Sequence, residues 1–238
     1  MIRFRDISLK VKILVIMLIG IVALAVTFSF LFTESIGKQA TRAIIEKSHA
    51  VVFTAEAVRE NMAGKLEQGV IRDLDDLAEE GDRDKLLEAV PIITAIEVAQ
   101  KNADRANYRF RVPKESPRNP DNEPTELESR VLAELKETDA EEKVIYEENQ
   151  VRYFRPIKLT EECMLCHGSP AGEPDPIGGT KEGWKVGEIH GAFEIISSLD
   201  AAQATQRWAA VNITLISLVL LIALGFLGFS GLGPGTTF

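Results

Sequence analysis

The sequence Cys163-Met164-Leu165-Cys166-His167-Gly168 contains the only two cysteines among 238 residues. Two cysteines three positions apart, followed directly by a histidine, are the attachment pattern of a c-type haem. In such a site both thiols form thioether bonds to the porphyrin, and the histidine is an axial ligand of the iron. The motif therefore predicts covalently attached haem c, with Cys163 and Cys166 as attachment residues and His167 as the fifth iron ligand.

Three other interpretations of the cysteine pair explain less of the sequence. A thioredoxin-like pair requires a βαβ context and a helix N-terminus that lowers the thiol pKa, and neither pattern surrounds this motif. A zinc site requires four ligands, usually as two separated pairs, and the chain has no second pair of cysteines. A disulfide suits an exported protein but leaves the role of His167 unexplained.

Charge and hydropathy divide the chain into a polar middle and two apolar flanks. The first twelve residues carry four Lys and Arg against one Asp, and residues 13–33 are uncharged. An apolar run of this length spans the roughly 30 Å of bilayer hydrocarbon at about 1.5 Å per residue. Residues 34–207 hold 23 Lys and Arg against 35 Asp and Glu, and a second uncharged run begins at Trp208. The sequence predicts transmembrane helices within residues 1–33 and 208–230.

The charge asymmetry predicts the orientation of these spans. Basic flanks remain on the cytoplasmic side of a membrane, so the acidic residues 34–207 are expected to be exported. A cleavable signal peptide is the alternative for the first span, but its apolar core exceeds the usual length of about 7 to 15 residues and no small-residue cleavage site closes it. We therefore expect two spans in a bacterial inner membrane and a periplasmic domain, the compartment in which haem is attached covalently.

Hydrophobic periodicity predicts helices first and a small antiparallel sheet afterwards. Apolar residues recur at helical spacings from Ile44 to Met62, which predicts one long helix that continues from the first span to about residue 80. A further helix is expected after a cap at Asp82 or Asp84, running to about residue 103, and at Pro91 it either bends or a new helix begins. The other expected elements are a strand over 108–112, a helix over 125–136 that opens with a capping box, a hairpin of 144–146 with 151–159, a Gly- and Pro-rich haem loop over 168–183, and a strand over 188–196. This order predicts an α+β, PAS-like fold.

The polar middle resembles the PAS-like, c-haem-binding periplasmic sensor domains of bacterial chemoreceptors and histidine kinases, which are also known as stand-alone haem proteins in cyanobacteria. The resemblance covers about residues 34–200 and implies the same fold and cofactor. It is carried by the haem motif and by Phe110-Arg111-Val112-Pro113, Pro117-Arg118-Asn119-Pro120, Arg152-Tyr153-Phe154-Arg155-Pro156-Ile157, Gly183-Trp184-Lys185-Val186-Gly187 and His190-Gly191-Ala192-Phe193.

One feature departs from the receptor pattern. Such receptors continue past the second span into a HAMP linker and a signalling coiled coil or a kinase. Here only residues 231–238, a short uncharged tail, follow the second span. We therefore expect no cytoplasmic output module, so that the chain is either a truncated receptor or acts by contacting another membrane protein.

The sequence leaves four alternatives for the sixth iron ligand: Met62, His49, His190, or no protein ligand. The resemblance implies that a residue of the N-terminal helix reaches the iron, which favours Met62 or His49. Met62 lies on the apolar stripe, and a thioether is a known axial ligand, although a lone methionine more often fills a gap in the core. His49 lies off that stripe, where histidine is commonly solvated. His190 lies on the predicted polar face of the last strand, where a hydrogen bond to a haem propionate is its other role.

Five further residues are candidates for contact with the haem. The three arginines on the strands beside the haem loop, Arg111, Arg152 and Arg155, are suited to pairing with the propionates because a guanidinium forks onto a carboxylate. Exposed strand arginines are the alternative. Tyr153 and Trp184 are expected to wall the porphyrin, which needs apolar surface around its ring.

Two functions of different classes agree with these features. The first is a sensor, in which a redox change or a diatomic gas at the iron shifts a helix and the membrane spans transmit that shift. The second is a tethered electron carrier that docks on a redox partner through its acidic surface. Pairing through the N-terminal helix predicts a homodimer. The acidic balance argues against nucleic acid, and without a triad, P-loop or paired carboxylates we expect no enzymatic activity.

Overall fold

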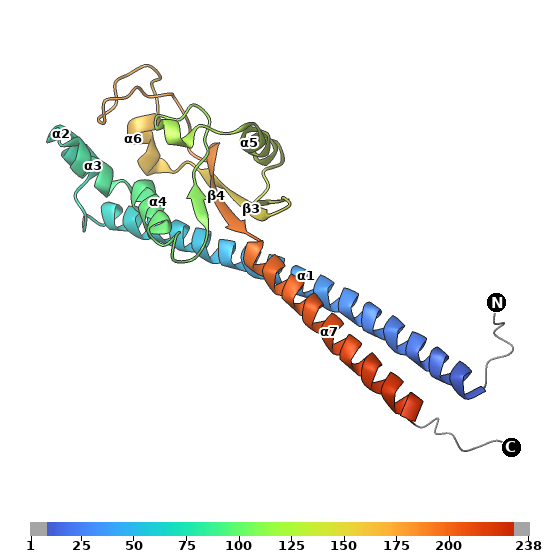
Figure 1. Cartoon of the computed structure of the whole chain (residues 1–238). Coiled ribbons are helices and arrows are strands. Elements are labelled where there is room, and N and C mark those ends of the chain that lie inside the picture. The colour runs from blue at the N-terminus through green and yellow to red at the C-terminus, as the bar shows by residue number, and fades with distance from the viewer. Residues whose placement is uncertain (1–8, 231–238) are drawn as a thin grey trace, which may run out of the picture. The chain divides into compact units, whose positions relative to one another are not determined.

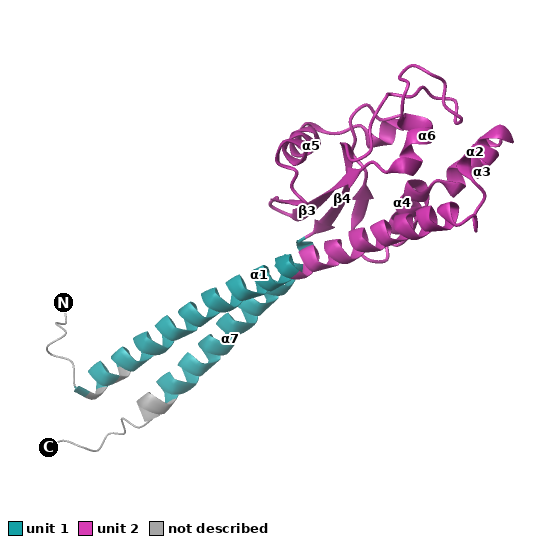
Figure 2. Ribbon diagram, turned by 180° about the vertical axis from the view of Figure 1, so that it is seen from behind, with its two compact units in different colours: residues 1–42, 199–238 teal, residues 43–198 magenta. Residues whose placement is uncertain are grey.

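The computed structural model describes residues 9–230, and for residues 10, 14 and 227–230 it describes the backbone only. The predicted basic N-terminal tail, up to residue 8, and the predicted short tail over 231–238 lie outside the described residues. The chain divides into two compact units (Figure 2). One consists of Met1–Arg42 and Leu199–Phe238, and the other is Ala43–Ser198.

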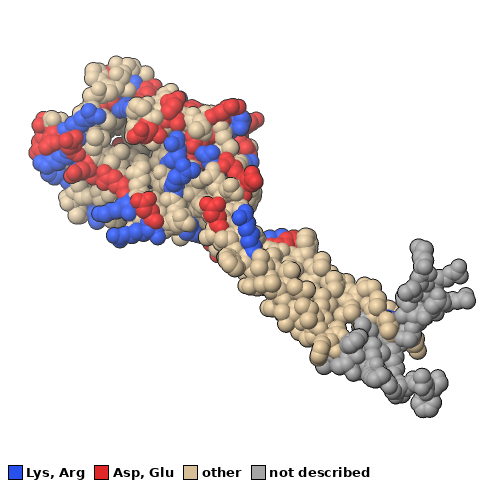
Figure 3. Space-filling view, in the orientation of Figure 1, with Lys and Arg blue, Asp and Glu red and all other residues tan. Residues whose placement is uncertain are grey.

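The first unit consists of two apolar helices. The helix α1 spans Leu9–Glu67, so its N-terminal part belongs to this unit, and α7 spans Asp200–Ser230. Within the unit the two run side by side (Figure 1), and Gln206 Nε2 donates a hydrogen bond to the Thr33 carbonyl at 3.0 Å. Few charged side chains interrupt their surface (Figure 3). Both helices are long and apolar enough to cross a membrane, which makes them candidate spans at the two predicted places.

The second unit is built on a four-stranded antiparallel sheet with the strand order β1-β4-β3-β2. The strands are β1 (Arg109–Arg111), β2 (Lys143–Tyr146), β3 (Gln150–Lys158) and β4 (Ile189–Ser198). In the centre of the sheet Ile195 of β4 pairs with Phe110 on one side and with Tyr153 on the other. The predicted α+β fold with a small antiparallel sheet is confirmed.

Short helices precede and interrupt this sheet. They are α2 (Leu74–Glu79), α3 (Arg83–Ala89), α4 (Pro91–Lys101), the 3-10 turn η2 (Pro120–Asn122) and α5 (Glu126–Thr138). The predicted capping box begins α5: Thr125 accepts from the Glu128 amide, while the Glu128 carboxylate accepts from the Thr125 amide at 2.7 Å. Pro91 is the first residue of α4, so a new helix begins there because proline lacks an amide proton and disfavours a helical residue before it.

The long helix ends earlier than its periodicity predicts. Instead of continuing to about residue 80, α1 ends at Glu67, where Val70 N bonds to Lys65 O and Gly69 N bonds to Leu66 O. This pair of bonds is a Schellman motif, and it requires a left-handed residue. Gly69 supplies that residue, with a φ of 68°.

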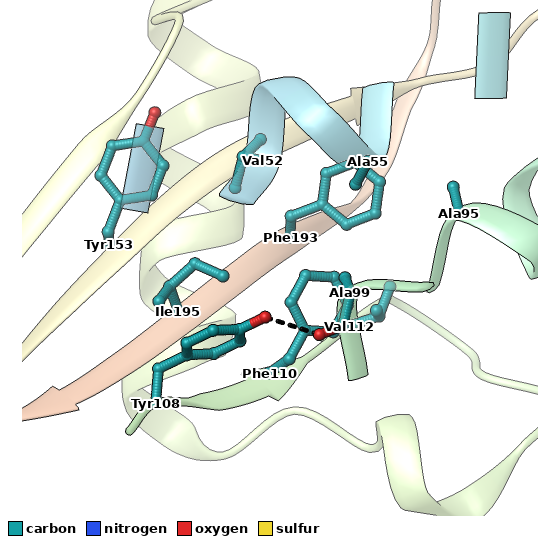
Figure 4. Close-up of a cluster of buried hydrophobic side chains, with 10 residues drawn as sticks. All are labelled: Val52, Ala55, Ala95, Ala99, Tyr108, Phe110, Val112, Tyr153, Phe193 and Ile195. Carbon is teal, nitrogen blue, oxygen red and sulfur yellow. Dashed lines mark hydrogen bonds between the residues drawn. The ribbon is translucent and has the colours of Figure 1, made fainter. Parts of the chain in front are cut away.

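Both faces of the sheet are covered. On one face Val52 and Ala55 of α1 and Ala95 and Ala99 of α4 belong to the same apolar cluster as the sheet residues Phe110, Tyr153, Phe193 and Ile195 (Figure 4). On the other face α5 packs its apolar residues, and it covers Glu194, whose residue is fully buried. The face of β4 predicted to be polar is therefore interior, because α5 lies over it. A third apolar cluster, of α2 and α3, includes Leu165 and Ile177 from the region of the cysteine motif.

Candidate functional site

The two cysteines and His167 lie in two short helical turns after β3. The 3-10 turn η3 spans Glu161–Cys163 and α6 spans Met164–His167. Residues three apart in a helix lie on one face, and both cysteines are half-buried free thiols on the wall of the same cavity. The local fold therefore presents the two sulfur atoms to a common space.

This cavity is largely aliphatic and also contains His167 in its wall. Together with its open mouth it holds about 1070 Å³ of empty space. Its aliphatic residues come from α2, α3, α4, β3 and the loop after the motif, and include Leu74, Leu87, Ile92, Ile96, Ile157 and Ile177. The cationic side chains in its wall are those of Arg59 and Lys114.

The orientation of His167 is set by Glu182 and Trp184. The Nδ1 atom of His167 lies 2.8 Å from Glu182 Oε2. Because an ionised carboxylate only accepts hydrogen bonds, Nδ1 carries the proton and Nε2 is the ring nitrogen available to a metal. The Trp184 ring stacks on the imidazole, with centroids 4.7 Å apart, and its amide donates to the His167 carbonyl at 2.9 Å. Burial lowers the pKa of His167, which favours the neutral, metal-binding form.

Arg118 organises the loop that follows the motif. Its guanidinium donates to both carboxylate oxygens of Glu182, at 2.9 and 3.0 Å, and to the carbonyls of Cys166 and Thr180. It also pairs with Asp175, whose side chain is fully buried. Desolvation works to raise the pKa of Glu182, but hydrogen bonds from Arg118 and His167 hold it below its ordinary value. Glu182 therefore faces His167 as an anion.

The thiol of Cys166 is not activated as a nucleophile. Burial, with Asp175 nearby, raises its pKa to about 11. Redox-active thiols are instead stabilised as thiolates by a helix N-terminus or a cation. This site is thus unlike a thioredoxin-like cysteine pair.

The structure places the three strand arginines away from the cavity wall and so corrects their predicted propionate role. Arg111 and Arg152 lie on the sheet face covered by α5, where Arg152 Nη2 contacts Glu128 at 2.7 Å. Both also pair with the buried Glu194, and Arg152 Nη1 lies 3.6 Å from Glu147 Oε1. Arg155 lies on the opposite face and pairs with Glu56 at 2.9 Å. Each guanidinium neutralises a carboxylate of the fold.

The remaining candidates are divided between core and cavity. Tyr153 is fully buried in the core and donates from its hydroxyl to Glu142 at 2.8 Å, so it does not wall the cavity. His49 contacts the same Glu142 carboxylate at 2.8 Å and stacks edge-on against Tyr153. Neither His49 nor Met62 is part of the cavity wall, whereas Trp184 and His190 are. Of the three side chains considered as sixth ligand, His190 alone lines the cavity.

His190 is itself held by two neighbours. Its ring stacks on Trp184 with centroids 3.9 Å apart, and its Nε2 lies 3.2 Å from Glu188 Oε2. The same indole therefore stacks on both His167 and His190. These contacts fix the His190 ring on Trp184.

Comparison with known proteins identifies the family. Residues 37–198 match the family model described as Tll0287-like. The chain belongs to the Tll0287-like family. The match contains the whole of the unit Ala43–Ser198 and every residue of the cavity wall.

A solved structure of the Tll0287-like fold agrees with this assignment. It is titled the crystal structure of the cyanobacterial heme-protein Tll0287, and it matches with a TM-score of 0.51 and 19% sequence identity. The match covers 65% of this chain and 94% of that chain. At this identity the likeness shows a common fold. No curated protein matches the chain.

Three polar residues of the site do not stand out in the sequence. Arg59 lies on α1 one turn after Ala55, where periodicity indicates only a polar position. Lys114 and Glu182 lie in loops, and the latter meets its arginine partner across 64 residues of chain. The sequence did signal the arginine partner of Glu182, because Arg118 lies in Pro117-Arg118-Asn119-Pro120, one of the segments that carry the family resemblance.

Proposed function

We propose that the chain is a membrane-anchored c-type haem protein, with a single haem attached through Cys163 and Cys166 and ligated by His167. The observation that carries this proposal is the meeting of both free thiols and the His167 ring on the wall of one aliphatic cavity. The hydrogen bond from His167 Nδ1 to Glu182 supports the proposal further, because a metal-binding histidine usually donates a hydrogen bond from its second ring nitrogen to a carboxylate or carbonyl. The related cyanobacterial protein is described as a haem protein.

The residues of the cavity suit the two chemical parts of a haem. Its aliphatic wall would cover the porphyrin, and Lys114 and Arg59 would pair with the carboxylates. Lys114 forms no ion pair with a described carboxylate, its Nζ lies 5.4 Å from the centroid of the Trp184 ring, and burial lowers its pKa. Arg59 donates to the Lys158 carbonyl at 3.2 Å and retains further donors on its guanidinium. When bound, the haem would supply one-electron chemistry and an exchangeable axial position.

We propose sensing of redox state or of a diatomic gas as the role of this haem. The support is the continuity of α1, which runs from Leu9 to Glu67. Arg59 of this helix lines the cavity, Val52 and Ala55 anchor it in the core, and its N-terminal part is a candidate membrane span. A change of charge or ligation in the cavity would therefore act on a helix that enters the membrane.

A tethered electron carrier is the second proposed function. A groove beside the motif shares Arg59, Leu74 and Glu162 with the cavity wall. Its acidic residues are Glu60, Glu67, Asp73, Asp75, Glu161 and Glu162. Acidic surfaces favour fast association with basic partners, so this rim would suit docking of a basic redox protein close to the cysteines.

The proposed location is the inner membrane of a bacterium, with residues 34–207 in the periplasm. The test uses the full chain expressed with and without the periplasmic haem-attachment machinery. Haem staining should survive on a denaturing gel only when that machinery is present, and Cys163→Ala with Cys166→Ala should abolish it. Staining that persists in the double variant would refute covalent attachment.

The visible spectrum of the reduced protein, recorded with and without carbon monoxide, distinguishes a sensor from an electron carrier. Ready binding of carbon monoxide supports a sensor, because the gas requires an open or displaceable axial position. A spectrum that carbon monoxide leaves unchanged, combined with rapid electron exchange with a soluble redox protein, supports the carrier.

A further inference from the structure

Arg118 and Glu182 form the contact that connects the loop after the motif with the imidazole of His167. Glu182 Oε2 accepts from two donors, His167 Nδ1 at 2.8 Å and Arg118 Nη2 at 3.0 Å. Glu182 Oε1 accepts from Arg118 Nε at 2.9 Å. The same carboxylate oxygen is therefore shared between the proposed axial ligand and a guanidinium.

The contact between Arg118, Glu182 and His167 is largely shielded from solvent, and further bonds hold Arg118 in place. The side chains of Arg118, Glu182 and His167 are 24%, 23% and 20% exposed. Arg118 also donates to the carbonyl of Cys166, the residue directly before His167, at 2.8 Å. Its position is fixed from behind by the fully buried carboxylate of Asp175. A single guanidinium thus holds the carboxylate that orients the imidazole and the backbone that carries it.

Each partner has a defined electrical effect on the imidazole. A carboxylate that accepts from Nδ1 makes the ring a stronger electron donor through Nε2. An arginine that forms a bidentate pair with the same carboxylate partly neutralises its negative charge. Electron donation from His167 through Nε2 is therefore weaker than it would be beside an unpaired carboxylate. The other charged group that acts on this ring is Lys114, whose effect has the same sign as that of Arg118.

We propose that Arg118 is a positioning residue that acts through Glu182 to set the electron donation of His167, and with it the reduction potential of the haem. This inference rests on the proposed function. A stronger axial donor stabilises the ferric state, and hydrogen bonds around an axial ligand are among the means by which proteins tune a haem. The Arg118–Glu182 pair would keep the potential higher than an unpaired carboxylate would allow.

The test is redox titration of the full-length holoprotein in detergent, with the visible spectrum as readout. Glu182→Gln removes the anion and should raise the potential. Arg118→Gln leaves the anion unpaired and should lower it, while Arg118→Lys, which keeps the charge, should stay close to the wild type. In the Glu182→Gln background the shift caused by Arg118→Gln should shrink, because its route to the imidazole is gone.

Matched controls are available on α5. Arg130 and Glu126 form an exposed pair with side chains 66% and 89% exposed. Arg130→Gln and Glu126→Gln make the same changes of charge outside the cavity wall and should leave the potential unchanged. The iron–histidine stretching band of the ferrous, five-coordinate protein gives a second readout, and it should fall in Glu182→Gln and rise in Arg118→Gln.

Three results would overturn the inference. They are a rise in potential in Arg118→Gln, a shift no larger than that of Arg130→Gln, and an Arg118→Gln shift that is unchanged in the Glu182→Gln background. If Arg118→Gln fails to accumulate, Glu182→Gln still tests the inference, because a potential equal to that of the wild type in this variant refutes it. Failure of the proposed function looks different, since the wild type would then carry no covalent haem.

Discussion

Arg152 of β3 and Glu194 of β4 form an ion pair inside the sheet domain, with 2.5 Å between Arg152 Nε and Glu194 Oε1. Glu128 of α5 reaches the same guanidinium, so two carboxylates share this buried place. Glu194 Oε2 is buried without a hydrogen-bond partner. Desolvation, together with Glu128, raises the pKa of Glu194 to about 8. The domain therefore folds most readily with a proton on this pair of carboxylates.

We predict that this proton makes stability fall with rising pH. The folded-state pKa lies above that of an unfolded glutamate, about 4.3. The stabilising contribution of protonated Glu194 to the folded state is thus fully present below the unfolded-state pKa and is lost as pH rises through about 8. Glu194→Gln mimics the protonated acid, so it should match the wild type at pH 5 and exceed it at pH 9.

Thermal unfolding at several pH values, followed by circular dichroism, measures this effect. Glu126→Gln, at a side chain 89% exposed, is the matched control and should preserve the wild-type pH dependence. An equal decline of stability with pH in Glu194→Gln and in the wild type would show that another group carries the proton.

Patterns among neighbouring residues predicted most of the helices and strands. They did not predict which side chains contact each other when the residues are far apart in the sequence. The capping box at Thr125, the interruption at Pro91 and the alternation of β3 and β4 depend on a few neighbouring residues, and the structure contains all of them. The end of α1 was also signalled locally, by Gly69, but the apolar periodicity of the helix outweighed it.

The partners of the arginines were predicted incorrectly because charge and spacing do not say which face a helix will cover. Arg152 alternates as an exposed strand residue would, but α5 buries it against Glu128. Lys114, in contrast, lies in a loop, and an isolated β-bridge pairs it with Gly191, which is distant in the sequence and also lines the cavity. The motif itself could be recognised because it occupies five consecutive residues.

Two substitutions should separate the structural cations from those that serve the cavity. Arg152→Ala removes the nearer of the two arginines that the buried Glu128 and Glu194 carboxylates share. Removing one member of a buried ion pair costs about 3 to 5 kcal/mol, so the unfolding temperature should fall sharply. The visible spectrum of the folded fraction should stay unchanged, because Arg152 does not line the cavity.

Lys114→Ala should have the opposite profile. We expect a shifted haem spectrum and potential, because the proposed carboxylate partner is lost, with a small change in unfolding temperature. Thermal scans and redox titrations of both variants provide the comparison. A normal spectrum and potential in Lys114→Ala would remove this residue from the proposed site.

Gly179 should tolerate no side chain. A Cβ atom there would lie 2.6 Å from Asp175 Oδ2 and 3.0 Å from Arg118 Nη1, both inside the arginine-centred cluster of the loop. Gly179→Ala should therefore disturb the loop, lower the yield of haem-loaded protein and shift its potential. Gly64→Ala is the matched control: no atom lies within 4 Å of its Cβ position, and it lies in α1. It should stabilise the helix by up to about 1 kcal/mol. Equal haem yields and potentials in the two variants would contradict the proposed role of the loop.

Visible spectra can also decide which residue, if any, is the sixth ligand of the proposed haem iron. Met62 and His49 do not line the cavity, so Met62→Leu and His49→Gln should reproduce the wild-type spectra in both oxidation states. His190 lines it but is held by Trp184 and Glu188. We therefore expect the reduced wild type and His190→Gln to bind carbon monoxide with similar affinity. A large gain in affinity in His190→Gln would identify His190 as a ligand that the gas must displace, and a changed spectrum in Met62→Leu would give that role to the thioether.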